Sequence, residues 1–265
     1  MISKKNSMHS IEEKLKAFER LLEVMDELRE KCPWDREQTL ESLRNLTIEE
    51  TYELADAIID QDLVEIRKEL GDLMLHIVFY SKIGSEKGAF DIADVLNGVC
   101  DKLVFRHPHV FGEKKVKDAG EVLENWEELK MKEGNRSVLA GVPPSLPAMI
   151  KAHRIQDKVR AIGFDWDRRE QVWDKVNEEL REVEYELNNG QEHEKMENEI
   201  GDLLFSVINA ARLYKVEPET ALERTNRKFI KRFKYLESKA LEMNRSLKEM
   251  SLEEMEAIWQ EAKSI

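Results

Sequence analysis

Four carboxylates stand in two matched pairs in the second half of the sequence. Glu179 and Glu182 are three residues apart on one predicted helix, and Glu199 and Asp202 have the same spacing on the next. Residues three apart share a helix face, so an antiparallel hairpin would gather all four at its seam. Packed carboxylates repel one another and lose hydration. Ligands that are all oxygen favour a hard divalent cation, Mg²⁺ first and Mn²⁺ second.

The alternative is that these groups are solvated surface charges, because 37% of the residues are charged. The same pattern, however, occurs earlier in the chain. Glu50 and Glu53 are followed by Glu69 and Asp72 at nearly the same separation. Solvated charge has no reason to recur in this way. The repeat therefore favours a metal site in the second half and a related one in the first.

Each half also carries a lysine and an arginine four residues apart on a predicted helix. These are Lys228 and Arg232 in the second half and Lys102 and Arg106 in the first. A point charge beside a bidentate guanidinium suits a polyphosphate. A single such pair would be a solvated face, but its recurrence at matched positions favours a phosphate site.

A tryptophan and a lysine recur downstream in the same way. They are Trp126 and Lys130 in the first half and Trp259 and Lys263 in the second. An exposed tryptophan next to a lysine can stack on a base while the lysine touches a phosphate. The alternative, a docking anchor for the last helix, stays open at this point.

The acidic pairs require helices to position them. From Val176 to Leu187 apolar residues recur at helical spacing, which predicts a first helix. The residues Asn188-Asn189-Gly190 then predict a turn. The stretch after this turn has a second apolar stripe as far as Asn209, which predicts a second helix. The first hairpin is predicted over 47–80, with Thr47 and Glu50 as a capping box.

Other stretches are also typical of helices. The predicted helices are 11–31, capped by Ser10 with Glu13, a further pair over 91–105 and 118–133, and a last helix capped by Ser251 with Glu254. A break is expected at the glycines and serine of 84–88. No βαβ pattern and no glycine-rich phosphate loop is present. The expected fold class is all-α, with two repeated helical-bundle domains.

A proline-rich, nearly uncharged stretch divides the two repeats. Residues 136–147 contain three of the six prolines in the chain and predict a linker. The expected domains are therefore 1–135 and 148–265.

These motifs resemble the MazG family of nucleoside triphosphate pyrophosphohydrolases. The resemblance rests on Glu-Glu-x-x-Glu followed by Glu-x-x-Asp, present here as 178–182 with 199–202 and as 49–53 with 69–72. Two such repeats in one chain are similar to the full-length bacterial proteins. The resemblance implies an all-α, dimeric, Mg²⁺-dependent enzyme that cleaves a nucleoside triphosphate to the monophosphate and pyrophosphate.

The resemblance also implies roles for individual residues. Metal ligands fall on Glu179, Glu182, Glu199 and Asp202, and nucleotide contacts on Lys175, Glu178, Glu179, Lys228, Arg232 and Trp259, to which the pattern of residues adds Lys263. The corresponding first-half residues are a second set: Glu50, Glu53, Glu69 and Asp72 for the metal, and Lys102, Arg106, Trp126 and Lys130 for the nucleotide. In some two-domain members only the second domain is catalytic.

The overall composition fits such an enzyme better than several other classes. A net charge of −13 argues against a nucleic-acid binder, which usually carries a basic face. The beginning of the chain has no apolar signal segment, and its longest apolar run is too short to span a bilayer. Cys32 and Cys100 fit neither a disulfide framework nor a zinc site. We expect buried free thiols, a cytoplasmic location and no membrane partner.

The proposed chemistry is Mg²⁺-dependent hydrolysis at the α-phosphorus, with one carboxylate as general base. A di-iron bundle protein would need Glu-x-x-His on its helices, and none of the six histidines has a glutamate three residues before it. A non-catalytic helical scaffold that has kept a metal site is a second alternative, mainly for the first domain.

The two repeats differ at positions that could decide which repeat catalyses the reaction. Asn209 follows Asp202 by two helical turns, and the corresponding first-half residue is Phe79. An amide there could orient a water or a phosphate oxygen, whereas a phenyl ring could not. The turn His107-Pro108-His109 occurs only in the first half, and it is expected to be a structured turn or a substrate-facing loop rather than a metal site. The second domain is therefore predicted to supply most of the turnover.

Overall fold

The structure is a computed structural model that describes residues 8–118, 120–122, 125–126, 129, 137–189 and 192–264. Within these ranges every regular element is a helix and no strand occurs, so the all-α prediction is confirmed. The chain divides into two compact units, Met1–Lys115 and Val116–Ile265. The finer limits predicted for the domains and their linker stay a prediction.

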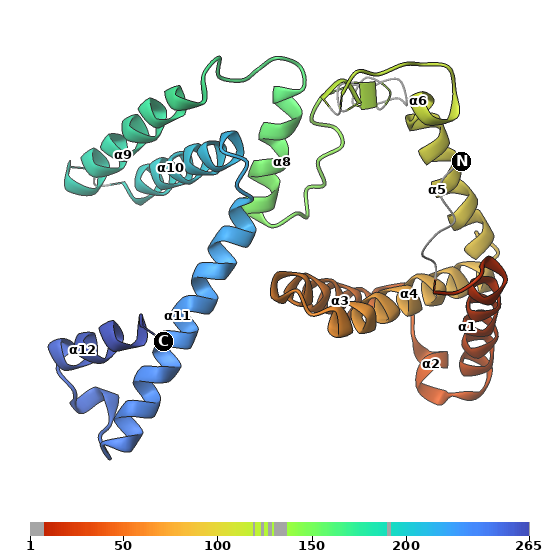
Figure 1. Cartoon of the computed structure of the whole chain (residues 1–265), viewed down its shortest axis with the longest axis horizontal. Coiled ribbons are helices and arrows are strands. Elements are labelled where there is room, and N and C mark those ends of the chain that lie inside the picture. The colour runs from red at the N-terminus through yellow and green to blue at the C-terminus, as the bar shows by residue number, and fades with distance from the viewer. Residues whose placement is uncertain are drawn as a thin grey trace. The chain divides into compact units, whose positions relative to one another are not determined.

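The first unit is built around the hairpin of α3 and α4, which lie side by side in Figure 1. Its helices are α1 (Ile11–Lys31), α2 (Pro33–Glu37), α3 (Leu40–Asp60), α4 (Leu63–Glu86), α5 (Ile92–Arg106) and α6 (Pro108–Phe111). The core contains Met25, Leu43, Val78, Phe79 and Ile83, contributed by α1, α3 and α4. The long apolar stripes of these helices therefore fix the hairpin against α1.

The second unit repeats this plan with the hairpin of α9 and α10, and α8 packs against α10. Its elements are α8 (Ala148–Arg160), η1 (Arg169–Gln171), α9 (Val172–Asn189), α10 (His193–Leu213), α11 (Pro218–Glu242), η2 (Leu247–Glu249) and α12 (Leu252–Ala262). Gln156 of α8 donates to the carbonyl of Phe205 at 2.8 Å. A separate core of Leu236, Ala240, Met250 and Ile258 joins α11 to α12.

Two predicted helix starts are confirmed in detail. Ser10 and Glu13 form a reciprocal capping box at the start of α1, and Ser251 and Glu254 form one at the start of α12. Each cap satisfies backbone N–H groups that have no partner inside the helix.

The predicted start of the first hairpin is wrong. Helix α3 begins at Leu40, where Thr39 and Ser42 form the capping box. Thr47 lies inside the helix, and its hydroxyl donates to the Leu43 carbonyl at 3.0 Å. Leu40 and Leu43 pack in the core, and burying them extends the helix two turns beyond the predicted cap.

Two smaller predictions also need correction. The break expected over 84–88 begins later, because α4 continues through Gly84 to Glu86 and Gly88 then adopts a positive φ of 65°. Cys32 and Cys100 are free as expected, but Cys32 is half-buried and Cys100 is exposed, because α5 has no fully buried residue. Of the predicted helix 118–133, only 120–122, 125–126 and 129 lie among the described helical residues. No helix in the described ranges is both long and apolar enough to cross a membrane.

An arginine brace joins the loop before α9 to the end of α10. Arg212 is buried and forms a bidentate pair with Asp165, with one N–O distance of 3.0 Å. It also donates to the Asn209 side-chain oxygen at 3.0 and 2.8 Å. The first unit has a related brace, in which Arg29 pairs with Glu86 and donates to the carbonyls of Asp35 and Gln38. These braces hold the two ends of each hairpin in register.

Replacing Arg212 with methionine should destabilise the fold by about 2 kcal/mol, because the buried guanidinium of Arg212 would no longer donate its charge-assisted hydrogen bonds to Asp165. Burial acts to raise the pKa of Asp165, but the hydrogen bonds from Arg212 and from the Trp166 N–H, with the charges of Arg212 and Arg160, hold it below its ordinary value. The stability that the pair contributes is therefore present above about pH 4 and is lost as the pH falls further.

Chemical denaturation of the wild type and the variant at pH 7 and pH 3 measures this effect. Lys195→Met on the same helix is the matched control, because its ion pair with Glu192 is exposed on both sides and is worth less than about 1 kcal/mol. A loss for Arg212→Met no larger than that of the control at pH 7 would show that the brace is dispensable.

Candidate functional site

The carboxylates of the second repeat are positioned by the amphipathic helix α9. Val172 and Val183 are buried on its inner side, and Glu179 lies one turn before Val183 on the same side. Only 5% of Glu179 is exposed. Packing of α9 on α10 thus forces one acidic group into the seam.

Three of the four predicted ligands converge there. Carboxylate oxygens of Glu179, Glu199 and Asp202 all lie within 4.8 Å of one another. Glu182 is outside this group and belongs to a neighbouring one, formed with Glu178 and Glu179 under the same limit. Glu179 is common to both groups and is the centre of the cluster.

The first repeat gathers a related but different set. Glu50, Glu53 and Glu69 have carboxylate oxygens within 4.8 Å of one another, and Asp72 is not part of this group. The pKa of Glu50 is raised, first by burial and then by the negative charges of Asp72, Glu53 and Glu69. Asp72 is therefore close enough to act electrostatically although it lies outside the group.

The most buried carboxylate is at different positions in the two repeats. In the second repeat it is Glu179 on the first helix of the hairpin, and in the first repeat it is Glu69 on the second helix, with 3% exposed. Each has a lysine beside it. Lys175 Nζ lies 2.5 Å from Glu179 Oε1, and Lys68 Nζ lies 2.8 Å from Glu69 Oε1. Sequence reasoning gave Lys68 no role.

In each cluster several carboxylates lie close together, and one lysine ammonium pairs with the most buried of them. Hydrogen bonds to Glu179 and Glu178 raise the pKa of Lys175, and a hydrogen bond to Glu69 raises that of Lys68. The pKa of Glu182 is also raised, first by desolvation and then by Glu179 and Glu199. Each cluster can accept further positive charge.

Of the predicted nucleotide contacts of the second repeat, Lys175, Glu178 and Glu179 lie at the carboxylate cluster, whereas the others lie on another part of the unit. Lys228 and Arg232 are on α11, and Lys263 follows α12. Trp259 packs against Phe229 of α11, with ring centroids 4.9 Å apart. This contact fits the anchor alternative for Trp259. Among the described residues, none of these four on or after α11 and α12 forms a hydrogen bond or an ion pair with the carboxylate groups.

The corresponding residues of the first repeat are less completely placed. Lys102 is exposed on α5, while Arg106 and Trp126 are half-buried. Lys130 lies outside the described residues. His107 and His109 flank Pro108, which begins the short helix α6 after α5 ends at Arg106. The segment is thus a structured connection between two helices, and a substrate-facing role for it stays a prediction.

Asn209, predicted to orient a water or a phosphate oxygen, makes a structural contact in this unit. Its side-chain oxygen accepts two hydrogen bonds from Arg212 and is therefore part of the brace. The first repeat instead places His76 and Tyr80 around Thr47, with distances to its hydroxyl of 2.9 Å from His76 Nδ1 and 2.6 Å from the tyrosine oxygen. Sequence reasoning missed this partly buried polar chain, because its members lie on two helices.

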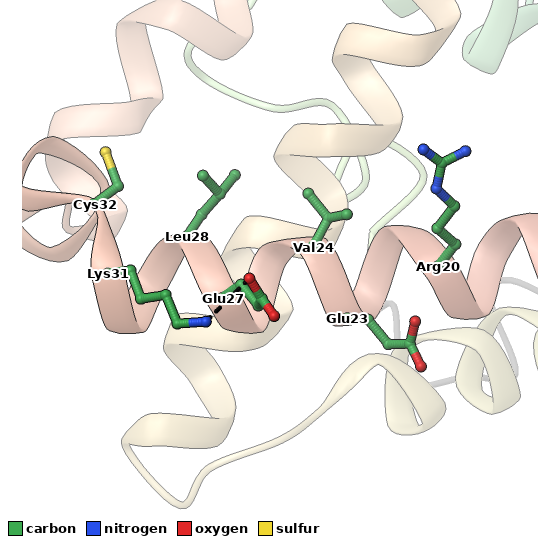
Figure 2. A pocket seen from close by; sticks show the side chains of 7 residues that line it. All are labelled: Arg20, Glu23, Val24, Glu27, Leu28, Lys31 and Cys32. Carbon is green, nitrogen blue, oxygen red and sulfur yellow. Dashed lines mark ion pairs between the residues drawn. The ribbon is translucent and has the colours of Figure 1, made fainter.

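A shallow groove along α1 is separate from both clusters. Figure 2 shows that its side chains come from one side of this helix, with Lys31 paired to Glu27 at 3.1 Å. None of the predicted ligands lines it. A groove made by one helix brings no polar groups together from different elements, so it is not the candidate site.

Comparison with known proteins places the chain among nucleotide hydrolases. The family model for the MazG nucleotide pyrophosphohydrolase domain matches residues 38–111 and 168–236, which contain both hairpins. The nucleoside triphosphate pyrophosphohydrolase of Escherichia coli K12 is 41% identical over 254 residues, covering 93% of this chain and 97% of that protein.

Two further relatives extend this result. The nucleoside triphosphate pyrophosphohydrolase/pyrophosphatase MazG of Thermotoga maritima is 40% identical over 251 residues, covering 93% of this chain and 95% of that protein. YabN of Bacillus subtilis, of uncharacterized function, is 44% identical over 235 residues, which are 88% of this chain and 48% of that protein. With both hairpins matched and the similarity extending over nearly all of its length, the chain belongs to the MazG nucleotide pyrophosphohydrolase family.

Proposed function

We propose that this protein is a Mg²⁺-dependent nucleoside triphosphate pyrophosphohydrolase that removes unwanted nucleotides from the cytoplasmic pool. It would convert an NTP or dNTP and water to the monophosphate and pyrophosphate. The names of relatives about 40% identical over most of the chain support a hydrolase of the triphosphate anhydride bond. The observation that carries the proposal is the convergence of Glu179, Glu199 and Asp202 at one seam.

The residues present fit a divalent cation. Glu69 Oε2 is buried and has no hydrogen-bond partner, which is costly for a charged oxygen. In the second repeat one lysine faces three converging carboxylates. Both observations favour a hard cation with oxygen ligands, for which Mg²⁺ is the first candidate and Mn²⁺ a substitute.

The roles of the residues follow from this placement. Glu179, Glu199 and Asp202 would hold the cation, which when bound supplies Lewis-acid polarisation of phosphate oxygens and a more acidic water. Glu182 lies outside that group and has a raised pKa, so it is suited to accept a proton from the attacking water. No ion pair with a described residue holds Lys228 or Arg232, which leaves both charges for the leaving pyrophosphate.

We assign most of the turnover to the second repeat. Its group combines the buried Glu179 of α9 with both predicted ligands of α10, Glu199 and Asp202. In the first repeat Asp72 is left out of the group.

The carboxylate of Glu69 should cost stability when no cation is present. Glu69→Gln should raise the stability of the protein in chelator by about 1 kcal/mol, because a buried oxygen without a partner loses its charge. It should also reduce the extra stability that Mg²⁺ gives, since a bound ion stabilises only the state that binds it.

Thermal unfolding in chelator and in Mg²⁺ measures both effects. Glu65→Gln is the matched control, because Glu65 also faces Lys68 but is half exposed. If Glu69→Gln is less stable in chelator and gains as much from Mg²⁺ as the wild type, the first cluster is not a cation site.

The two repeats should respond differently to loss of a ligand. Glu199→Gln should lower Mg²⁺-dependent pyrophosphate release by more than about 100-fold, because it removes a group that stabilises the transition state. Glu69→Gln should leave most of the activity. Pyrophosphate release from a mixed NTP pool, with circular dichroism to verify folding, measures this. Comparable losses from two folded variants would indicate two working sites.

Arg232 should act on the substrate rather than on the fold. Arg232→Ala should raise the KM for the triphosphate about tenfold by removing a charge-assisted contact, while stability changes by less than about 0.5 kcal/mol. Arg224→Ala, an exposed arginine on the same helix, is the control. Unchanged kinetics together with a sharp loss of stability would make Arg232 structural.

We also propose a homodimer. Each hairpin exposes large apolar side chains in the single chain, including Leu187 at 58% and Leu204 at 54%. Large apolar side chains this exposed favour an interaction surface, which the second copy would cover. Nucleic acid and membrane are not expected as partners.

Light scattering at micromolar concentration should give twice the chain mass of 31.1 kDa. Leu204→Glu should shift the mass toward that of the single chain, because a charge would be buried at the interface. A single-chain mass for the wild type would refute the dimer.

A further inference from the structure

Lys175 occupies the place where the carboxylates most need positive charge. Its ammonium lies 2.5 Å from Glu179 Oε1 and 2.9 Å from Glu178 Oε1. Glu199 and Asp202 converge on Glu179 from α10. One lysine therefore balances part of a cluster of four acids, and the most buried of them is its closest partner.

The first repeat shows that this pairing follows burial rather than position. There the buried acid is Glu69, and its lysine is the adjacent Lys68 on α4. The residue corresponding to Lys175 is Leu46. The residue in the second repeat that corresponds to Lys68 is Asn198. In each repeat the lysine is therefore on the same helix as the buried glutamate, although that helix differs between the repeats. The role of the lysine is to balance the charge of that glutamate.

The ammonium of Lys175 is not a permanent part of the core. Its side chain is 40% exposed, whereas that of Glu179 is 7% exposed. A lysine is a point charge on a flexible stem, and it can leave its partner at little steric cost. A divalent cation would place twice the charge against the same oxygens and would repel the ammonium.

We propose that Lys175 is a stand-in cation: it holds Glu179 in the cation-free protein, gives it up when the cluster takes a divalent cation, and then binds a phosphate of the nucleotide. This inference rests on the proposed function and adds to it the order in which the cation and the nucleotide bind. Lys175 becomes available to a triphosphate only once the cation is bound. Free nucleotide without a divalent cation thus meets a site whose nearest lysine is engaged.

The first test measures cation binding without turnover. Metal-free full-length chain is titrated with Mn²⁺ alone, and free Mn²⁺ is followed by electron paramagnetic resonance. The titration uses a Glu69→Gln background to silence the first cluster. Lys175→Met should bind Mn²⁺ about tenfold more tightly than its parent, because no ammonium competes for Glu179. Lys175→Gln serves if the methionine variant does not fold without metal.

Lys195→Met removes the same charge from an exposed pair on the same hairpin and should leave Mn²⁺ affinity within about twofold. The second test is kinetic: Lys175→Met should raise the KM for the triphosphate at saturating Mg²⁺. Lys175→Met is thus expected to bind Mn²⁺ more tightly and the triphosphate more weakly. A purely structural lysine would weaken both, and a simple phosphate contact would leave Mn²⁺ affinity unchanged.

Each outcome decides a separate point. No Mn²⁺ binding by the parent protein would overturn the proposed function itself. Mn²⁺ binding that is equal or weaker in the folded Lys175 variants would overturn the stand-in role and leave the function standing. Tighter Mn²⁺ binding with an unchanged KM would overturn the transfer of Lys175 to phosphate.

Discussion

One buried carboxylate in each repeat, and its need for a matching positive charge, governs the design of this protein. Glu179 and Glu69 are nearly inaccessible to water, and a charge in that position is unstable unless it is paired. A lysine supplies the partner in both repeats. The surrounding acids exceed what a lysine can balance, so the cluster keeps a capacity for a divalent cation. Charge that would destabilise a purely structural bundle is thus the basis of the proposed activity.

The helical scaffold exists to hold this arrangement in place. Apolar stripes bury one side of each hairpin, and the arginine braces at Arg212 and Arg29 fix the hairpin ends. Both braces use charge-assisted hydrogen bonds, which are stronger than those between neutral groups. The packing of α11 on α12 forms a separate core, which carries the basic residues assigned to phosphate. The residues proposed for the cation and those proposed for phosphate therefore lie on different helices of the same unit.

Much of this was predictable from local patterns. The repeat of Glu50 and Glu53 at Glu179 and Glu182 identified both hairpins, and the Ser10 and Ser251 caps followed from capping chemistry. Features that depend on tertiary packing were not predictable. Which glutamate becomes buried, and hence which lysine pairs with it, is decided by side chains on two helices. Asn209 was read from one helix alone, whereas its partner Arg212 is recruited by Asp165 from a distant loop. Thr47 was read as a cap because its core neighbours could not be seen.

The most direct test of the central claim is the position of the metal. Crystals of the full-length chain grown with Mn²⁺ and a non-hydrolysable triphosphate can be measured at a wavelength where manganese scatters anomalously. The account predicts an anomalous peak within ligand distance of Glu179, Glu199 and Asp202, with the phosphates beside it. A fully occupied nucleotide with no peak at these carboxylates, or with manganese bound only elsewhere, would contradict it.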